Sequence, residues 1–173
     1  MIITKKLDYT FFGRDALDVA PELPGKFLHL RTHSETKEYL ITEVEAYRGE
    51  EDKACHASKG RTSRTEIMYH KGGHIYVYLI YGMYWMLNFV TSREGIPQAV
   101  LIRGLENFPG PGKLTKSLGI DKSFYGENLV TSEKIWVEDH GFSPAIETSP
   151  RVGIDYSGEP WVSKPWRFYI KKG

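Results

Sequence analysis

Carboxylates, an aromatic ring and a histidine are concentrated between residues 43 and 56, which read Glu-Val-Glu-Ala-Tyr-Arg-Gly-Glu-Glu-Asp-Lys-Ala-Cys-His. An ionised carboxylate is costly to bury without partners, so acids beside an aromatic ring are more typical of an active site than of a core. We therefore expect this segment to carry out the chemistry of the protein.

The residues just before this segment must position its side chains, and residues 39–47 have the apolar, β-prone content of a strand. Side chains alternate between the faces of a strand, so a period of two predicts four residues on one face, namely Ile41, Glu43, Glu45 and Tyr47. A carboxylate would then lie beside the Tyr47 ring, and the period alone ranks Glu43 and Glu45 equally.

The composition predicts one globular domain, residues 1–173, because 40% hydrophobic and 13% aromatic residues suffice for a core. The sequence has no signal-peptide pattern and no apolar run of the ~20 residues that span a membrane, which predicts a cytoplasmic protein without membrane contact. The single cysteine, Cys55, fits a reducing compartment and leaves no thiolate cluster for zinc. We therefore predict no metal site and a monomer.

The net charge of +1 says little about the partners of the protein, but its basic residues are unevenly distributed along the chain. Residues 53–74 contain five Lys or Arg against one acid, and residues 161–173 contain four Lys or Arg and no acid. Two such segments could contact phosphates, or could equally be two solvated faces of the protein.

Short strands with few helices are expected along the chain. The patterns predict a short helix over 15–20, a helical turn over 113–118 with Gly119 as its C-cap, and strands over 26–31, 99–103, 134–138, 151–156 and 166–171. Apolar runs over 74–80 and 83–90 flank Tyr81-Gly82, which predicts a hairpin.

The tyrosines of this hairpin allow two interpretations. Tyr76 and Tyr78 share a face by alternation, and Tyr81 lies at the bend, where a side chain can project from the fold. They could simply pack in a core, which is the commoner outcome for a tyrosine in such a run. They could instead form a stacking surface for bases, with a residue at the tip that enters a groove of DNA.

Motifs in order from about Phe11 to Ile170 resemble those of the alkyladenine (3-methyladenine) DNA glycosylases. They include Glu45-Ala46-Tyr47, Asp52 with His56, the run 76–84, Asn88, Leu101-Ile102-Arg103, Gly110-Pro111-Gly112-Lys113-Leu114, Ile120-Asp121-Lys122, Arg151-Val152-Gly153 and Lys164-Pro165-Trp166-Arg167. The resemblance implies an α+β domain with a curved antiparallel sheet, surrounding helices, a protruding β-hairpin and no cofactor. It also implies double-stranded DNA with damaged purines as the partner.

The family hydrolyses the N-glycosidic bond of alkylated or deaminated purines after flipping them out of the duplex. By resemblance, Glu45 activates the water, while Arg103 and the carbonyl of Val152 assist it; Glu43 then becomes a structural candidate. The matching base-binding residues are Tyr47, His56, Tyr76, Tyr78 and Asn88, and Tyr81 matches the intercalating residue. Arg61, Arg64, Lys113 and Arg151 are the candidates for contact with the DNA backbone.

Other functions are less well supported by the sequence. A noncatalytic binder of damaged or single-stranded nucleic acid could use the same aromatic residues, but it would need neither Glu45 nor Arg103. A metal hydrolase could use Glu43, Glu45, Asp52 and His56, although one histidine makes a poor transition-metal site. No lysine stands out as a nucleophile, although Lys53 and Lys113 are possible, and this favours a glycosylase that does not cleave the strand.

Overall fold

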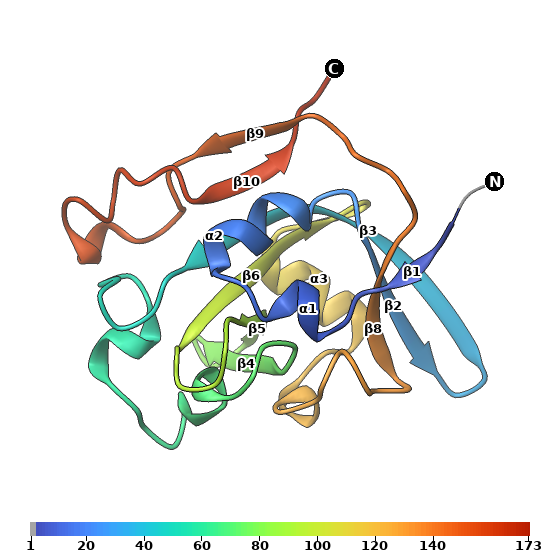
Figure 1. Ribbon diagram of the computed structural model, residues 1–173, viewed down its shortest axis with the longest axis horizontal. Helices are drawn as coiled ribbons and strands as arrows, with labels where there is room; N and C mark the ends of the chain where they lie inside the picture. Colours follow the sequence, from blue (N-terminus) through green and yellow to red (C-terminus); the bar gives the residue numbers. More distant parts are fainter. Residues whose placement is uncertain (1–2) are drawn as a thin grey trace.

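The computed structural model describes residues 3–173, so the first two residues of the predicted 1–173 domain lie outside it (Figure 1). The strands are β1 (Lys5–Lys6), β2 (Phe27–Thr32), β3 (Glu35–Tyr47), β4 (Ile75–Ile80), β5 (Tyr84–Thr91), β6 (Gln98–Leu105), β7 (Phe108–Pro109), β8 (Ile135–Asp139), β9 (Ile146–Ser149) and β10 (Arg167–Ile170). The α-helices are α1 (Tyr9–Phe12), α2 (Ala16–Val19) and α3 (Pro111–Leu118). Short 3-10 helices are η1 (Ala20–Glu22), η2 (His56–Lys59), η3 (Glu66–Tyr69), η4 (Lys122–Phe124) and η5 (Asp155–Ser157).

All the strands pair in an antiparallel manner, with a main order of β1-β8-β2-β3-β6-β5-β4. The long strand β3 links the two parts of this sheet. Its first residues pair with β2, and its later residues pair with β6 on one edge and with β10 on the other. Figure 1 shows β9 and β10 along the upper edge of the molecule and β1, β2 and β8 at its right side.

An irregularity in β3 decides which side chains face the site. The register between β3 and β6 shifts between Ile41 and Glu43 and again between Glu43 and Val44, which is the pattern of a β-bulge. The prediction that Ile41 shares a face with Glu43, Glu45 and Tyr47 is therefore wrong. Ile41 is fully buried in the main core with Val44 and Ala46.

The main core lies between the sheet and the helices. Apolar side chains from β2, β3, β5, β6 and β8 meet those of α1, α2 and α3 there. Helix α3 is fixed to β5 by Thr115, whose Oγ1 donates a hydrogen bond to the carbonyl of Trp85 at 2.7 Å. No helix within residues 3–173 has the length and apolar character needed to cross a membrane.

Strands β4 and β5 form the predicted hairpin, with Tyr81 to Met83 at its turn. Tyr81 is 87% exposed and has a φ of 52°, in the left-handed region that an aromatic residue rarely adopts. Met83 is also exposed, so the tip presents apolar side chains to solvent.

The α+β class and the curved antiparallel sheet are confirmed. Gly119 ends α3 with a φ of 70°, as its predicted C-cap role requires. The strand predicted over 151–156 is wrong, because these residues form a loop that enters η5. Gly153 has a φ of 73° and Gly158 a φ of 68° there, and left-handed glycines interrupt regular pairing.

Candidate active site

Glu45 lies in β3 where this strand is flanked on both edges, opposite Leu101 of β6 and Arg167 of β10. Its side chain is fully buried. The Tyr47 hydroxyl donates a hydrogen bond to Glu45 Oε1 at 2.8 Å, and the Val152 N–H donates one to Oε2 at 2.6 Å. Both carboxylate oxygens are therefore held in a fixed orientation.

Arginines surround this carboxylate without pairing closely with it. Arg103 places Nη1 3.8 Å from Glu45 Oε1, while its Nε donates to Glu43 Oε2 at 3.1 Å. Arg167 donates to the same Glu43 oxygen at 3.0 Å. Glu43 thus has the structural role assigned to it by the motif register, since it fixes Arg103 beside Glu45.

Burial and charge have opposite effects on the ionisation of Glu45. Burial raises the pKa of this carboxyl above its ordinary value, whereas the charge of Arg103 and the hydrogen bonds from Val152 and Tyr47 lower it. Burial is the larger effect. Burial also raises the pKa of Tyr47 well above its usual range, so its hydroxyl keeps the proton that it donates to Glu45.

The loop that supplies the Val152 N–H is fixed by a buried ion pair. Arg151 donates two hydrogen bonds to Asp52, with Nη1–Oδ2 at 2.6 Å and Nη2–Oδ1 at 3.0 Å, and Nη1 also donates to the Ala46 carbonyl at 3.0 Å. Both side chains are fully buried. The prediction that Arg151 contacts the DNA backbone is therefore wrong, because its guanidinium is enclosed between the rings of Tyr47 and Trp166.

A cavity with about 340 Å³ of empty space, part of it open to solvent, is lined by Tyr47, the hydrogen-bond partner of Glu45. Its walls include every predicted base-binding residue: Tyr47, His56, Tyr76, Tyr78 and Asn88. An outer cleft with about 840 Å³ of empty space, part of it open solvent, shares Tyr47, His56 and Tyr78 with this cavity. The cleft is also lined by Tyr81, Arg103 and Val152, so two of the three predicted water-binding groups line it, whereas Glu45 has no exposed surface.

The aromatic walls are packed against one another. The His56 and Tyr78 ring centroids are 4.3 Å apart, and those of Tyr76 and Tyr78 are 5.3 Å apart. His56 Nδ1 lies within hydrogen-bond distance of the Tyr76 hydroxyl, at 2.8 Å. Tyr76 is almost fully buried and supports the other two rings, while Tyr78 remains partly exposed to the cavity.

The ionisable groups of the cavity wall are neutral at pH 7. Burial, together with the nearby charges of Arg64 and Lys59, lowers the pKa of His56 to about 4. Burial raises the pKa of Cys55 to about 11 and that of Tyr76 to about 12. The cavity therefore offers uncharged ring faces, and Glu45 contributes the negative charge beside them.

Asn88 lies in β5 opposite Tyr76 and is buried. Its amide nitrogen donates to the carbonyls of Tyr76 and Met86, each at 3.3 Å. These two bonds fix the side chain against the floor of the cavity and prevent it from turning away.

The other residues predicted to contact the DNA backbone differ in how far their charges are already paired within the protein. Arg61 forms a close bidentate pair with Glu66, with N···O distances of 2.6 and 2.7 Å. Arg64 lies over the Tyr78 ring at 5.3 Å, and Lys113 is exposed on α3 in a groove beside the hairpin. Lys113 and Arg64 therefore lie next to the cleft with their charges less engaged than that of Arg61.

The residues considered as metal ligands of a hydrolase do not form one common site: Glu43, Glu45, Asp52 and His56. Asp52 faces Arg151, and Glu43 faces Arg103 and Arg167. Arginines thus neutralise these carboxylates, and this alternative is wrong.

The sequence analysis missed Tyr156, which lines both the inner cavity and the outer cleft. Its hydroxyl donates to the Ala54 carbonyl at 3.1 Å and so connects the loop after Arg151 to the segment before His56. The two glycines and the Glu159-Pro160 pair around this residue were the available signal for a loop rather than a strand.

Replacing Asp52 with asparagine should lower the free energy of unfolding by about 3–5 kcal/mol, because it leaves the Arg151 charge buried without its partner. Urea denaturation measures this loss. Glu51→Gln is the matched control, since Glu51 is exposed and its pair with Arg48 should contribute less than about 1 kcal/mol. Equal stability of the two variants would contradict the importance of the buried pair.

Comparison with known proteins agrees with this geometry. A family model described as Methylpurine-DNA glycosylase (MPG) matches residues 10–109 and 107–173. Three relatives carry the name "Putative 3-methyladenine DNA glycosylase". The Natranaerobius thermophilus protein is 42% identical over 96% of both chains. The Legionella pneumophila (strain Corby) protein is 44% identical over 96% of this chain and 95% of its own, and the Rickettsia felis protein is 45% identical over 92% and 90%. The chain belongs to the methylpurine-DNA glycosylase family.

Proposed function

We propose that this DNA glycosylase for alkylated purines is a monomeric, monofunctional hydrolase, formed by residues 1–173 as one domain, that acts on bases flipped out of double-stranded DNA. The main support is Glu45, a fully buried carboxylate hydrogen-bonded to Tyr47, which is one of the residues that line an uncharged aromatic cavity. A protein that only bound nucleic acid would gain nothing from the cost of burying this charge.

Glu45 acts on a water in the outer cleft. Each carboxylate oxygen can accept about two hydrogen bonds, and Tyr47 and Val152 use one on each, so capacity for a water remains. The water oxygen attacks the anomeric carbon, its proton passes to Glu45, and the electrons of the N-glycosidic bond leave with the purine. The Val152 carbonyl and Arg103 orient the water, and general-base assistance of this kind contributes about 10²- to 10⁴-fold.

Charge provides the selectivity for alkylated purines. A purine alkylated at N3 or N7 is cationic, so the faces of Tyr47, His56 and Tyr78 add about 0.5–2 kcal/mol of cation–π attraction to the stacking that any base receives. A protonated His56 would repel this cation, and its lowered pKa avoids that. The carboxylate of Glu45 also favours the positive sugar that forms as the base leaves.

Two further groups read the edge of the base. Asn88, fixed by its bonds to two carbonyls, lies where the 2-amino group of guanine would clash with it. The backbone N–H of His56, at the start of η2, is the donor for the six-position of the purine. An adenine-type or hypoxanthine lesion has no 2-amino group to clash with Asn88 and can accept the hydrogen bond from the His56 N–H. A neutral lesion additionally requires protonation of the leaving base.

Tyr81 fills the space that the flipped base leaves. Flipping costs a few kcal/mol in glycosylases generally, and an inserted apolar side chain offsets part of this cost. A non-glycine residue with a positive φ stores about 1–3 kcal/mol of strain, which is typical of functional positions. Lys113 and Arg64 are the proposed phosphate contacts, with Arg61 secondary because Glu66 already engages it.

The cavity lining supports release of the base without strand cleavage. Among the described residues, those that line the inner cavity include no lysine, which a Schiff-base mechanism would need. Lys53 lines a neighbouring cavity, and Lys113 lies in a separate groove beside the hairpin.

Replacing Glu45 with glutamine should reduce single-turnover excision by about 10²- to 10⁴-fold, because the amide cannot take the proton from water. The assay follows free base and alkali-labile sites from a duplex with one hypoxanthine or ethenoadenine. Binding of the lesion duplex should persist. Glu43→Gln is the comparison, and it should lose less activity because Glu43 acts only by fixing Arg103. Excision by Glu45→Gln at the wild-type rate would remove Glu45 as the base.

The rate of excision should fall as the pH falls through the raised pKa of Glu45, because only the ionised carboxylate accepts a proton. Arg103→Met removes a charge that lowers this pKa, so the acid limb should move to higher pH. Arg167→Met is the control, since Arg167 contacts Glu43 and should shift the limb less. A pH–rate profile with the same acid limb in all three proteins would argue against this assignment.

Replacing Tyr81 with asparagine should leave the free energy of unfolding unchanged or higher, since asparagine tolerates a positive φ. The same change should weaken capture of a lesion duplex by about 5- to 150-fold, the equivalent of about 1–3 kcal/mol of stacking. Tyr81→Phe keeps the ring and should bind as the wild type does. Unchanged binding and excision by the asparagine variant would count against intercalation.

A further inference from the structure

A second group of potential ligand side chains lies on the outer face of the sheet formed by β2 and β8. His29 of β2 is paired with Trp136 of β8, so Glu138, two residues further along β8, shares its face diagonally. His140 follows directly after the end of β8. One ligand atom from each of His29, Glu138 and His140 lies within 4.8 Å of those of the other two.

Two of the three distances between these atoms match those around a tetrahedral metal ion. Glu138 Oε1 lies 3.5 Å from His29 Nε2 and 3.2 Å from His140 Nε2. Nitrogen and oxygen ligands that are about 2.0–2.2 Å from zinc at tetrahedral angles are about 3.3 Å from each other. The three side chains therefore need little movement to share one ion.

An unsatisfied nitrogen is the second, independent observation. His29 is only 8% exposed, and its Nε2 has no hydrogen-bond partner among residues 3–173. Its distances to Glu138 and to Glu38 Oε2, 3.5 and 3.6 Å, exceed those of a normal hydrogen bond. Buried polar atoms are nearly always paired, so this nitrogen requires a partner that protein atoms do not supply.

The surroundings hold the three side chains in this arrangement. The His29 ring stacks on Trp136, and the His140 ring stacks on Phe27. Trp136 Nε1 donates to Glu138 Oε2 at 2.6 Å, which leaves Oε1 directed at the two imidazoles. Hydrogen bonds of this kind to the non-coordinating atom of a ligand orient it in known metal sites.

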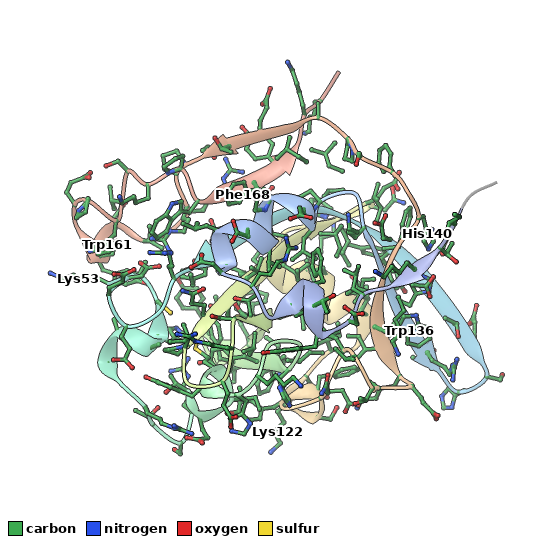
Figure 2. The ribbon with its side chains drawn as sticks, viewed as in Figure 1. Lys53, Lys122, Trp136, His140, Trp161 and Phe168 are labelled. Carbon is green, nitrogen blue, oxygen red and sulfur yellow. The ribbon has the colours of Figure 1, made fainter. Side chains whose placement is uncertain are left out.

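We propose that His29, Glu138 and His140 bind a divalent transition-metal ion, with zinc as the best match to two imidazoles and a carboxylate. Glu38 lies opposite His29 in β3, and its exposed carboxylate can turn to supply the fourth oxygen. The ion would join β2, β8 and β3 on their solvent face. The site lies far from the base cavity, because His140 and Trp136 are across the molecule from Lys53, which lines a neighbouring cavity that shares His56 with it (Figure 2).

Titration of chelator-treated full-length protein with ZnCl₂ tests the proposal, with heat of binding and thermal unfolding as readouts. The wild type should bind one Zn²⁺ per chain at this site and unfold at a higher temperature with zinc. His140→Ala should weaken binding by at least the 10- to 100-fold typical for loss of an outer hydrogen-bond partner of a ligand. Glu138→Gln should do the same, and unfolding of the metal-free variants shows whether each still folds.

Two matched controls separate this site from others. His33→Asn removes an exposed histidine from the β2–β3 turn, where its φ of 54° suits asparagine, and should bind zinc as the wild type does. Glu45→Gln should also bind normally, which excludes the active site. The proposal is overturned if the wild type binds no zinc, or if folded His140→Ala and Glu138→Gln variants bind it with wild-type affinity.

Discussion

The cost of burying one negative charge governs the structure of the active site. Glu45 has no exposed surface, and its partners come from β3, β6 and the loop after β9: Tyr47, Arg103 and the Val152 N–H. The loop can provide that N–H only because Arg151 is fixed by Asp52. A single carboxylate thereby requires residues more than a hundred positions apart to come together, and one of its partners, Tyr47, also lines the aromatic cavity.

The side chains that line the aromatic cavity are uncharged, and the arginines nearest to Glu45 are paired with acids. The rings of His56, Tyr76 and Tyr78 remain neutral because burial disfavours their charged forms. Arg103 and Arg151 are engaged by Glu43 and Asp52, which neutralises their charges beside the cavity. The tip of the hairpin is exposed and has a strained backbone at Tyr81, and it carries no charged group.

Local patterns were sufficient to predict most of the longer strands, the hairpin, the C-cap at Gly119 and a carboxylate beside the Tyr47 ring. The local patterns gave wrong predictions where contacts between residues distant in the sequence determine the position of a side chain. The bulge that moves Ile41 into the core arises from pairing with β6, and the burial of Arg151 depends on Asp52, ninety-nine residues away. The proximity of His29 to Glu138 and His140 likewise follows from the order of the strands, which spacing along one sequence does not reveal.

The bulge in β3 makes the length of this strand as important as its composition. Removal or addition of one residue between Thr42 and Val44 would exchange the two faces of everything that follows. Glu45 and Tyr47 would then point into the apolar core, while Val44 and Ala46 would line the cavity. Substitutions in this stretch alter one side chain, but a change in its length would remove the whole site. Insertions and deletions tolerated by this protein should therefore be confined to the turns and loops outside β3.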